Sequence, residues 1–374
     1  MMQRRSALVS MAGTAAALAL PAWAQERRIV LGQSAALSGP AAQLGLQLNR
    51  GARIFFERLN AEGGINGRSI ELKAMDDGYE PERCAVNTRA LINDDVFALF
   101  GYVGTPTSLA ALPLVNAAGM PFFGPFTGAE ALREPYSRNV FHVRASYYDE
   151  TALIVRQLTL LGQKKIAVFR QNDSYGQAGL DGVVRALKTE QLEPAAVGTV
   201  ERNTVNVAAA VQAIVAARPD AVVQISAYRS CAAFVREARK AGYGGTFYNV
   251  SFVGTQALAD NLGKDGLGVV VSQVMPFPFS TTTAISREYL DAVKNAGGDA
   301  TPNYSSMEGY LCAKVFAEGL RRGGASSREA LVNALEGLQR YDAGGYTVSF
   351  GPRNRRGSGF VELSMLTGDG KVRR

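Results

Sequence analysis

The feature that most constrains the fold of this chain is the regular alternation of short apolar strands with helices after residue 27. A first series runs from a predicted strand at 29–36 to a strand at 120–124, and a second runs from a helix at 149–161 to a strand at 268–274. Strands that alternate with crossover helices pair in parallel, so each series predicts a parallel sheet with helices on both faces. Two series predict two similar α/β lobes, with a cleft between their strand ends.

Segments rich in glycine or proline mark where the chain would cross between these lobes. Two of them, 276–280 and 351–357, lie beyond the second series, and Val143-Arg144-Ala145 is a third candidate. Three crossings would form a hinge. They predict that each lobe is built from two pieces of chain: residues 25–143 with 277–350, and residues 144–276 with 351–374.

The first 24 residues have the pattern of a secretory signal peptide. Arg4 and Arg5 form a basic start, an apolar run covers 7–20, and Ala22-Trp-Ala24 is a small-residue cleavage site. The arginine pair fits either general secretion or twin-arginine export. The apolar run is too short to span a bilayer, and no cysteine follows it to carry a lipid. We therefore expect cleavage after Ala24 and release into the periplasm.

The composition argues against a nucleic-acid-binding protein and against a disulfide-stabilised one. The 374 residues carry a formal net charge of +7, but lysines and arginines do not cluster with aromatic residues. The three cysteines, Cys84, Cys231 and Cys312, fall in predicted helices, and an odd number without paired spacing is not typical of a disulfide framework or a metal site. We expect them to be buried thiols.

No pattern in the chain indicates catalysis. His142 is the only histidine, and no Gly-x-Ser-x-Gly turn is present. One histidine cannot form a two-histidine metal site, and no phosphate-binding Walker loop occurs. His142 follows apolar residues and is expected to be structural. The sequence therefore predicts a protein that is not an enzyme and that needs no metal or cofactor.

A glycine-bracketed turn at 101–108 is the strongest candidate for a binding loop. It follows the predicted strand 97–100 and precedes a helix whose start is marked by Thr105, as the N-cap residue, and Pro106. Free backbone N–H groups, the helix dipole and nearby hydroxyls would favour a carboxylate or phosphate there. A second turn, 125–129, follows the next strand and would lie at the same sheet edge. Two ordinary capped turns explain the same pattern, and the turns alone do not decide between these interpretations.

Seven groups of residues, taken in order along the chain, resemble one protein family. They are Leu37 to Pro40, Gly51 to Arg53 with Asn60 to Gly67, Asp76-Asp77, Gly101 to Ser108, Asn172 to Gly176, Arg236 to Arg239 and Glu308 to Tyr310. Their order resembles the periplasmic solute-binding proteins of the leucine/isoleucine/valine type, the substrate-catching components of ABC importers. The resemblance covers essentially all of the mature chain.

This resemblance implies two Rossmann-like lobes, with parallel sheets flanked by helices, joined by a three-crossover hinge. It implies a monomer that captures a small carboxylate-bearing ligand, such as an amino acid, an aromatic acid or a 2-oxo acid, by hinge closure. It also implies delivery of that ligand to permease subunits in the inner membrane. A ligand-binding sensor that reports to a membrane or signalling partner is the alternative on the same fold.

A set of pocket residues follows from the resemblance. Thr105 resembles the hydroxyl residue that holds the ligand carboxylate, with Gly104 among the backbone donors around it. Tyr175 and Tyr228 resemble aromatic residues of the other lobe that close over the ligand, although aromatic cover at strand ends also explains them. The other first-lobe positions in this set are Tyr102, Phe126, Thr127 and Gly128.

Two further positions of the set depart from the family pattern. Leu44 stands where an aromatic residue commonly packs on the ligand, and Ser251 stands where amino-acid-binding members often place a glutamate against the ligand ammonium. A buried ammonium without a carboxylate partner carries a large desolvation cost. The sequence therefore favours a carboxylate that lacks an ammonium, unless Asp149 replaces the missing charge. The place of Asp149 at a helix start favours a capping role instead.

Overall fold

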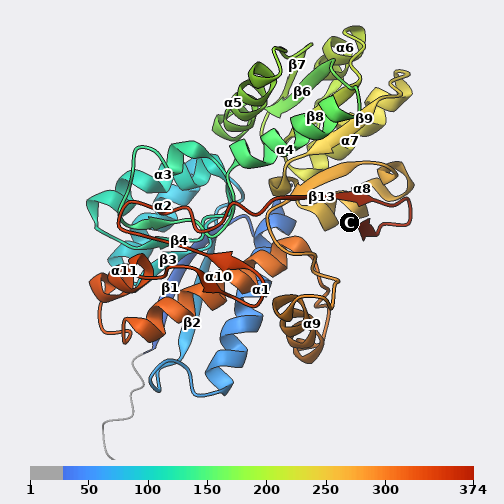
Figure 1. Ribbon diagram of the computed structural model, residues 1–374. Coiled ribbons are helices and arrows are strands. Elements are labelled where there is room, and N and C mark those ends of the chain that lie inside the picture. Colours follow the sequence, from blue (N-terminus) through green and yellow to red (C-terminus); the bar gives the residue numbers. More distant parts are fainter. Residues whose placement is uncertain (1–27) are drawn as a thin grey trace, which may run out of the picture.

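The computed structural model describes residues 28–374, which form two α/β lobes that lie one beside the other (Figure 1). The predicted signal peptide, residues 1–24, lies outside the described residues. Each lobe has its own sheet, one of five strands and one of seven, and most neighbouring strands are parallel. The predicted fold class, two lobes with parallel-dominated sheets flanked by helices, is confirmed.

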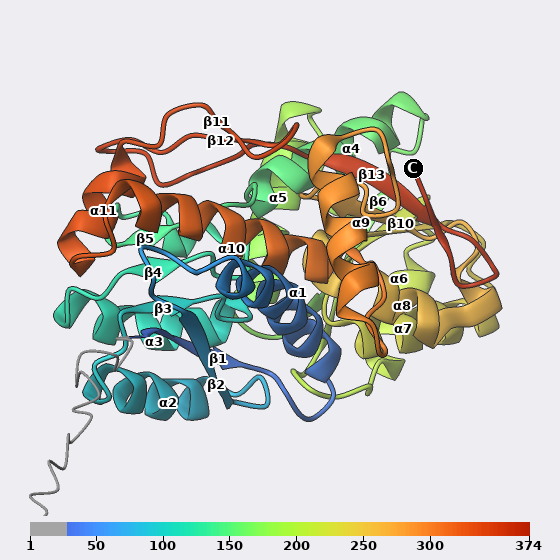
Figure 2. The ribbon, with the colours of Figure 1, turned by 90° about the horizontal axis from the view of Figure 1, so that it is seen from below.

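The first lobe is built around a fully parallel sheet. Its strands, in the spatial order β2-β1-β3-β4-β5, are β1 (Ile29–Ala35), β2 (Ile70–Asp76), β3 (Ala98–Phe100), β4 (Phe122–Phe123) and β5 (Val140–Phe141). Its helices are α1 (Ala42–Ala61), α2 (Pro81–Asn93), α3 (Thr105–Ala117), α9 (Ala284–Ala296), α10 (Tyr304–Arg322) and α11 (Arg328–Glu336). Helices α2 and α3 pack together on one face of the sheet, and α1, α10 and α11 lie on the other (Figure 2).

Helix α10 is held against α1 by close backbone contact. A Cβ atom added at Gly309 would lie only 2.0 Å from the carbonyl oxygen of Leu48 in α1. A larger residue at Gly309 would therefore force the two helices apart. This contact sets the position of the neighbouring residue Glu308, which faces the second lobe.

The second lobe is built around a sheet that combines parallel strands with two antiparallel strands from the end of the chain. Its strands, in the spatial order β14-β13-β10-β9-β8-β6-β7, are β6 (Ile166–Gln171), β7 (Val197–Val200), β8 (Ala221–Ile225), β9 (Thr246–Asn249), β10 (Val270–Gln273), β13 (Glu362–Leu366) and β14 (Val372–Arg373). Its helices are α4 (Tyr147–Leu160), α5 (Ser174–Thr189), α6 (Ala208–Ala216), α7 (Tyr228–Lys240) and α8 (Thr255–Leu262). Helix α4 packs on α5, and α7 packs on α6 and α8.

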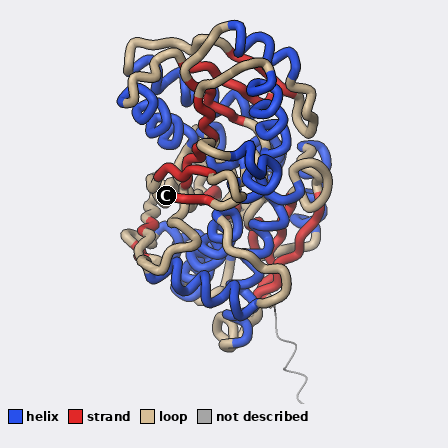
Figure 3. Tube along the Cα trace, turned by 90° about the vertical axis from the view of Figure 1, so that its right-hand side faces the viewer, coloured by secondary structure: helices blue, strands red, loops and turns tan. Residues whose placement is uncertain are grey.

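The chain passes between the two sheets three times. The passages lie between β5 and α4, between β10 and α9, and between β13 and a short ribbon of β11 (Tyr341–Asp342) and β12 (Thr347–Val348). The hydroxyl of Tyr346, in the ribbon, shares its hydrogen bond between the carbonyl oxygens of Val143 and Val274, at 3.0 and 3.1 Å, and so joins the first two passages to the ribbon. The C-terminus lies near this junction (Figure 3). The passages agree with the predicted crossings, whereas the lobe boundaries stay a prediction.

Three other properties of the described residues bear on the sequence predictions. Cys84, Cys231 and Cys312 are free and buried, as predicted. His142 is also buried, with Nε2 at 3.1 Å from the carbonyl oxygen of Leu132, in agreement with a structural role. Within residues 28–374, no helix is both long enough and apolar enough to cross a membrane.

Candidate functional site

An aromatic cluster from both lobes lies where the lobes meet. Phe252 of the second lobe is fully buried at its centre. Its ring centroid is 5.9 Å from that of Tyr79 and 5.4 Å from that of Phe126, both in the first lobe, and 4.7 Å from that of Tyr175 in the second. The carboxyl ends of strands from both sheets therefore converge on one apolar contact, as expected for the cleft of a two-lobed α/β protein.

Helix α3, which follows the predicted binding loop, begins one residue earlier than expected. Gly104 is the N-cap residue and Thr105 is the first residue of the helix, so the prediction that Thr105 is the N-cap is wrong. The reason is steric, because Gly104 has a φ of 101° and an added Cβ would lie 2.2 Å from the ring of Tyr79. The hydroxyl of Thr105 faces the second predicted loop, where it lies 2.7 Å from the hydroxyl of Thr127.

Two buried tyrosine hydroxyls lie beside these loops without a hydrogen-bond partner in residues 28–374. They belong to Tyr147, whose hydroxyl is near Thr127, and to Tyr175; the two ring centroids are 5.5 Å apart. The backbone of Tyr147 is fixed because its N–H donates to the carbonyl oxygen of Gly128 at 2.8 Å. Burial raises the pKa of both hydroxyls, so they remain donors at neutral pH. Buried, unsatisfied donors are costly, and they mark a place where a polar ligand atom would be stabilised.

A buried charge triad lies next to the aromatic cluster. The guanidinium of Arg144 is 3.4 Å from Glu150 and 3.5 Å from Glu308, and it stacks 4.9 Å from the ring centroid of Phe126. All three charged side chains are less than 5% exposed. The two carboxylates raise the pKa of Arg144 although burial opposes the charge. The triad links the first passage between the lobes to α4 and α10.

Glu150 connects the triad to Ser251. It accepts hydrogen bonds from the backbone N–H of Ser251 at 2.7 Å, from the Ser251 hydroxyl at 3.0 Å and from Ser272 at 2.6 Å. The Ser251 hydroxyl also contacts Arg144. Ser251 therefore lies in the cleft, as the resemblance implies, but as part of a polar network that the sequence did not indicate.

Glu308 lines a small internal cavity of about 10 Å³ between the lobes. Burial raises the pKa of this carboxyl group to about 7, although Arg144 opposes the shift. The other residues around the cavity come from the first-lobe loops, from the passages and from the second lobe: Phe126, Ser251, Gln273, Val274, Met275, Tyr304 and Ser305.

The start of helix α1 closes another side of the cleft. Leu44 is 1% exposed and packs against Gly254 of the second lobe. The backbone N–H of Gln43 points to the hydroxyl of Tyr228 at 3.5 Å. Leu44 of the first lobe therefore faces the second lobe, and Tyr228 of the second lobe faces the first. Both are candidates for contact with a ligand.

Tyr102 does not lie where the sequence interpretation puts it, whereas Asp149 has the capping role that its place at a helix start favoured. Tyr102 is in the core between the first sheet and helices α2 and α3, with its ring 4.9 Å from that of Phe122 and its hydroxyl 3.1 Å from that of Thr88. The prediction that the Tyr102 side chain lines the pocket is therefore wrong, because this side chain lies in the core on the α2 and α3 side of the sheet. Asp149 is exposed and forms a capping box with Ser146, so it cannot supply a charge inside the cleft.

A polar contact on the surface also joins the lobes. Arg202 of the second lobe donates to Glu80 of the first at 2.8 Å and to Asp173 of its own lobe at 3.4 Å. Asn203 adds a hydrogen bond to Glu80 at 2.8 Å. Together with the aromatic cluster, this contact holds the described conformation closed.

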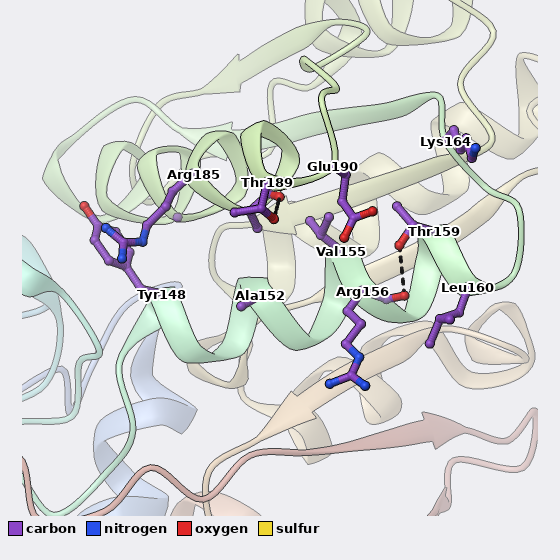
Figure 4. Close-up of a pocket in the computed structure, with 12 residues that line it drawn as sticks. Tyr148, Ala152, Val155, Arg156, Thr159, Leu160, Lys164, Arg185, Thr189 and Glu190 are labelled. Atoms are coloured by element: carbon purple, nitrogen blue, oxygen red, sulfur yellow. Dashed lines mark hydrogen bonds between the residues drawn. The ribbon is translucent and has the colours of Figure 1, made fainter.

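A larger hollow lies elsewhere, between α4 and α5 on the second lobe (Figure 4). It has a volume of about 530 Å³ and is lined by Tyr148, Arg156, Lys164 and Arg185 among other residues. None of the predicted pocket residues lines it. Size alone therefore does not identify the site, and the buried polar groups between the lobes are the stronger indication.

Comparison with known proteins identifies the family. The family described as periplasmic binding protein matches residues 28–370. The chain belongs to this family. A possible leucine/isoleucine/valine-binding protein from Rhodopirellula baltica is 34% identical, with a TM-score of 0.87, over 93% of this chain and 96% of that one.

Two other relatives agree with this family, and the second of them is of the leucine/isoleucine/valine type. A substrate-binding periplasmic protein from Ralstonia solanacearum is 34% identical, with a TM-score of 0.87, over 92% of this binding protein and 99% of that chain. Leu/Ile/Val-binding protein homolog 7 of Brucella melitensis is 26% identical over 367 residues, which is 92% of this chain and 90% of the relative. The resemblance inferred from the sequence is confirmed. Periplasmic binding proteins are exported, which agrees with the predicted signal peptide.

The sequence interpretation missed five residues of the site: Tyr79, Arg144, Tyr147, Glu150 and Phe252. It treated Arg144 only as part of a crossing, and Glu308 only as part of a family motif. A usable signal was present in both cases, because each is a single charge in an otherwise uncharged segment that the fold must bury.

Proposed function

We propose that this binding protein captures a small carboxylate-bearing ligand between its lobes and delivers it to permease subunits of an ABC importer in the inner membrane. No bond is made or broken in this function. The ligand carboxylate would lie at the start of α3, and closure of the second lobe would cover it with Tyr175 and Tyr228. The closed form would be the one that the permease recognises.

One observation carries this proposal. Polar groups from both lobes lie beside the two first-lobe loops: the Thr105 and Thr127 hydroxyls, which share one hydrogen bond of 2.7 Å, the Tyr147 hydroxyl near Thr127, and the Tyr175 ring, 5.5 Å from that of Tyr147. The N–H groups of Thr105 and Thr107, in the first turn of α3, have no partner within the helix. The positive end of the helix dipole adds to these donors. Such an arrangement stabilises an anion with two oxygen atoms, and family membership supports a transport role.

We expect Thr105→Val to weaken carboxylate binding by about 1.5–3 kcal/mol, the range for a hydrogen bond to a charged group. The measurement is calorimetric titration of ligand-stripped protein with amino acids, aromatic acids and 2-oxo acids. Thr107→Val is the matched control, because the Thr107 hydroxyl bonds to the Gly104 carbonyl oxygen at 3.1 Å and not to the cleft. Unchanged affinity in a folded Thr105 variant would remove Thr105 from the site.

A further inference from the structure

Four cations around the hollow between α4 and α5 have no carboxylate partner. Arg156, Lys164 and Arg185 line this hollow, and Lys165 follows Lys164 in the sequence. All four residues are exposed, and within residues 28–374 none of them forms an ion pair. Glu190 is the single carboxylate among the lining residues. The hollow therefore carries an excess of positive charge that the described part of the protein does not balance.

Two exposed leucines lie at one end of the same hollow. Leu160, which lines it, is 74% exposed, more than any other large apolar residue in the described range, and Leu161 is 59% exposed. They end helix α4, and Gly162, with a φ of 77°, turns the chain toward Lys164. Single exposed leucines are common on soluble proteins, but two in succession beside unpaired cations form an amphiphilic surface. The two leucines and the four cations together are the α4–α5 surface.

The cations of this surface are spread along the helices and are not gathered at one point. Arg185 lies over the ring of Tyr148 at one end of the hollow, 5.3 Å from its centroid, and Lys164 lies at the other end (Figure 4). Residues 148–160 of α4 alone span about 18 Å. One small anion cannot contact cations over this length, whereas a layer of anionic head groups can place one near each cation.

Other occupants fit the α4–α5 surface less well. A second copy of this chain in a two-fold pair would oppose the same unpaired cations to one another. A peptide seated in the hollow would leave Leu161 in water, because Leu161 is not among the lining residues. A lipid surface that covers the end of α4 would receive both leucines and would pair with the cations beside them.

We propose that the α4–α5 surface binds to an anionic phospholipid membrane, with its cations against the head groups and Leu160 and Leu161 in the interface. This contact goes beyond ligand capture, because it uses no group of the cleft. It is reversible, since two leucines and four cations supply far less binding energy than a membrane-spanning helix. Its effect is to hold the exported protein at the membrane surface, where a permease would receive the ligand.

The test is sedimentation of ligand-stripped protein with vesicles of phosphatidylglycerol or of phosphatidylcholine. We expect binding to phosphatidylglycerol at low salt, none to phosphatidylcholine, and release at about 1 M salt, where charges are screened beyond about 3 Å. Arg156→Gln combined with Lys164→Gln should weaken binding about 25-fold, since each cation near an anionic membrane contributes about fivefold. Leu160→Ser should weaken it about 3- to 10-fold through loss of apolar burial.

Matched controls are needed because a protein with a net positive charge attracts anionic vesicles through any face. Arg89→Gln combined with Lys294→Gln removes two charges from the first lobe, at exposed residues that form no ion pair within residues 28–374. Leu267→Ser changes a leucine that is 64% exposed, after α8 of the second lobe. Each control should change binding by less than about threefold, because it lies away from the α4–α5 surface.

A fluorescent label gives a second measurement that does not depend on affinity. Leu161→Cys accepts an environment-sensitive dye, because the three native thiols are buried. Its emission should shift to shorter wavelength with phosphatidylglycerol vesicles and stay unchanged with phosphatidylcholine. The same dye on Leu267→Cys should show no shift with either lipid.

Several results would overturn the membrane assignment. They are no binding to phosphatidylglycerol at low salt, equal weakening by the surface variants and their controls, or no shift at Leu161→Cys. Release by inorganic phosphate at constant ionic strength would indicate a site for a soluble anion, and binding to poly-glutamate in place of vesicles would indicate an acidic protein. A dimer in vesicle-free solution that the surface variants dissociate would indicate a second copy. None of these results alters the carboxylate affinity measured by calorimetry, so the proposed function is judged separately.

Discussion

Arg144→Met is expected to lower the free energy of unfolding by about 3–5 kcal/mol at pH 8, because it leaves two buried carboxylates without their cation. Arg144 is 1% exposed and faces Glu150 and Glu308. The measurement is urea unfolding of the ligand-stripped protein. Arg50→Met is the matched control, since Arg50 pairs with Asp299, whose side chain is 89% exposed, and such pairs contribute about 0–1 kcal/mol.

The effect of Arg144→Met should depend on pH in a defined direction. The pKa of Glu308 is raised to about 7, above the ordinary value of 4.5, so the folded state holds this proton more tightly than the unfolded state. That contribution to stability is present below pH 4.5 and is lost as the pH rises through 7. Without Arg144 the pKa of Glu308 rises further, and the destabilisation should be smaller at pH 5 than at pH 8. An equal loss at both pH values would contradict the presence of ionised carboxylates in the triad.

Phe252→Ala is expected to lower the free energy of unfolding by about 3–5 kcal/mol, the range for truncation of a buried phenylalanine. Its ring contacts Tyr79 and Phe126 of one lobe and Tyr175 of the other, so the change also removes the apolar contact that closes the cleft. Phe279→Ala, at a side chain that is 39% exposed, should change stability by less than about 1 kcal/mol. A loss below about 1 kcal/mol for Phe252→Ala would show that the aromatic cluster does not stabilise the folded form.

Much of the fold could be predicted from the sequence because local patterns determine it. Buried parallel strands are apolar runs that alternate with helices, and β1 and β10 lie almost where this pattern places them. The ribbon strand β11 and the last strand β14 were not predicted, because a strand of two residues is too short to show a period. The helix start at Gly104 was misplaced by one residue, since the Tyr79 ring that selects glycine there is distant in sequence.

The candidate site was harder to predict because its polar groups come from distant segments. Arg144 and Glu150 lie on either side of the start of α4, but Glu308 comes from α10 and reaches them only through the packing of α10 on α1. No periodicity links these positions. The sequence interpretation took Ser251 to mean that the cleft lacks a carboxylate. The fold instead brings two carboxylates there, Glu150 from α4 and Glu308 from α10.

The central claim, that ligand capture closes the two lobes, is tested most directly by an inter-lobe distance measured with and without ligand. Arg89 in α2 and Lys188 in α5 are exposed and lie in different lobes, so Arg89→Cys with Lys188→Cys accepts a pair of spin labels while the three native thiols stay buried. In ligand-stripped protein, we predict a distribution of inter-label distances that is broader, or that has a longer mean, than the distribution with ligand. Saturation with the carboxylate that binds most tightly in the calorimetric titration should shift it to a single shorter distance that matches the closed structure. An identical distribution before and after saturation would contradict capture by closure.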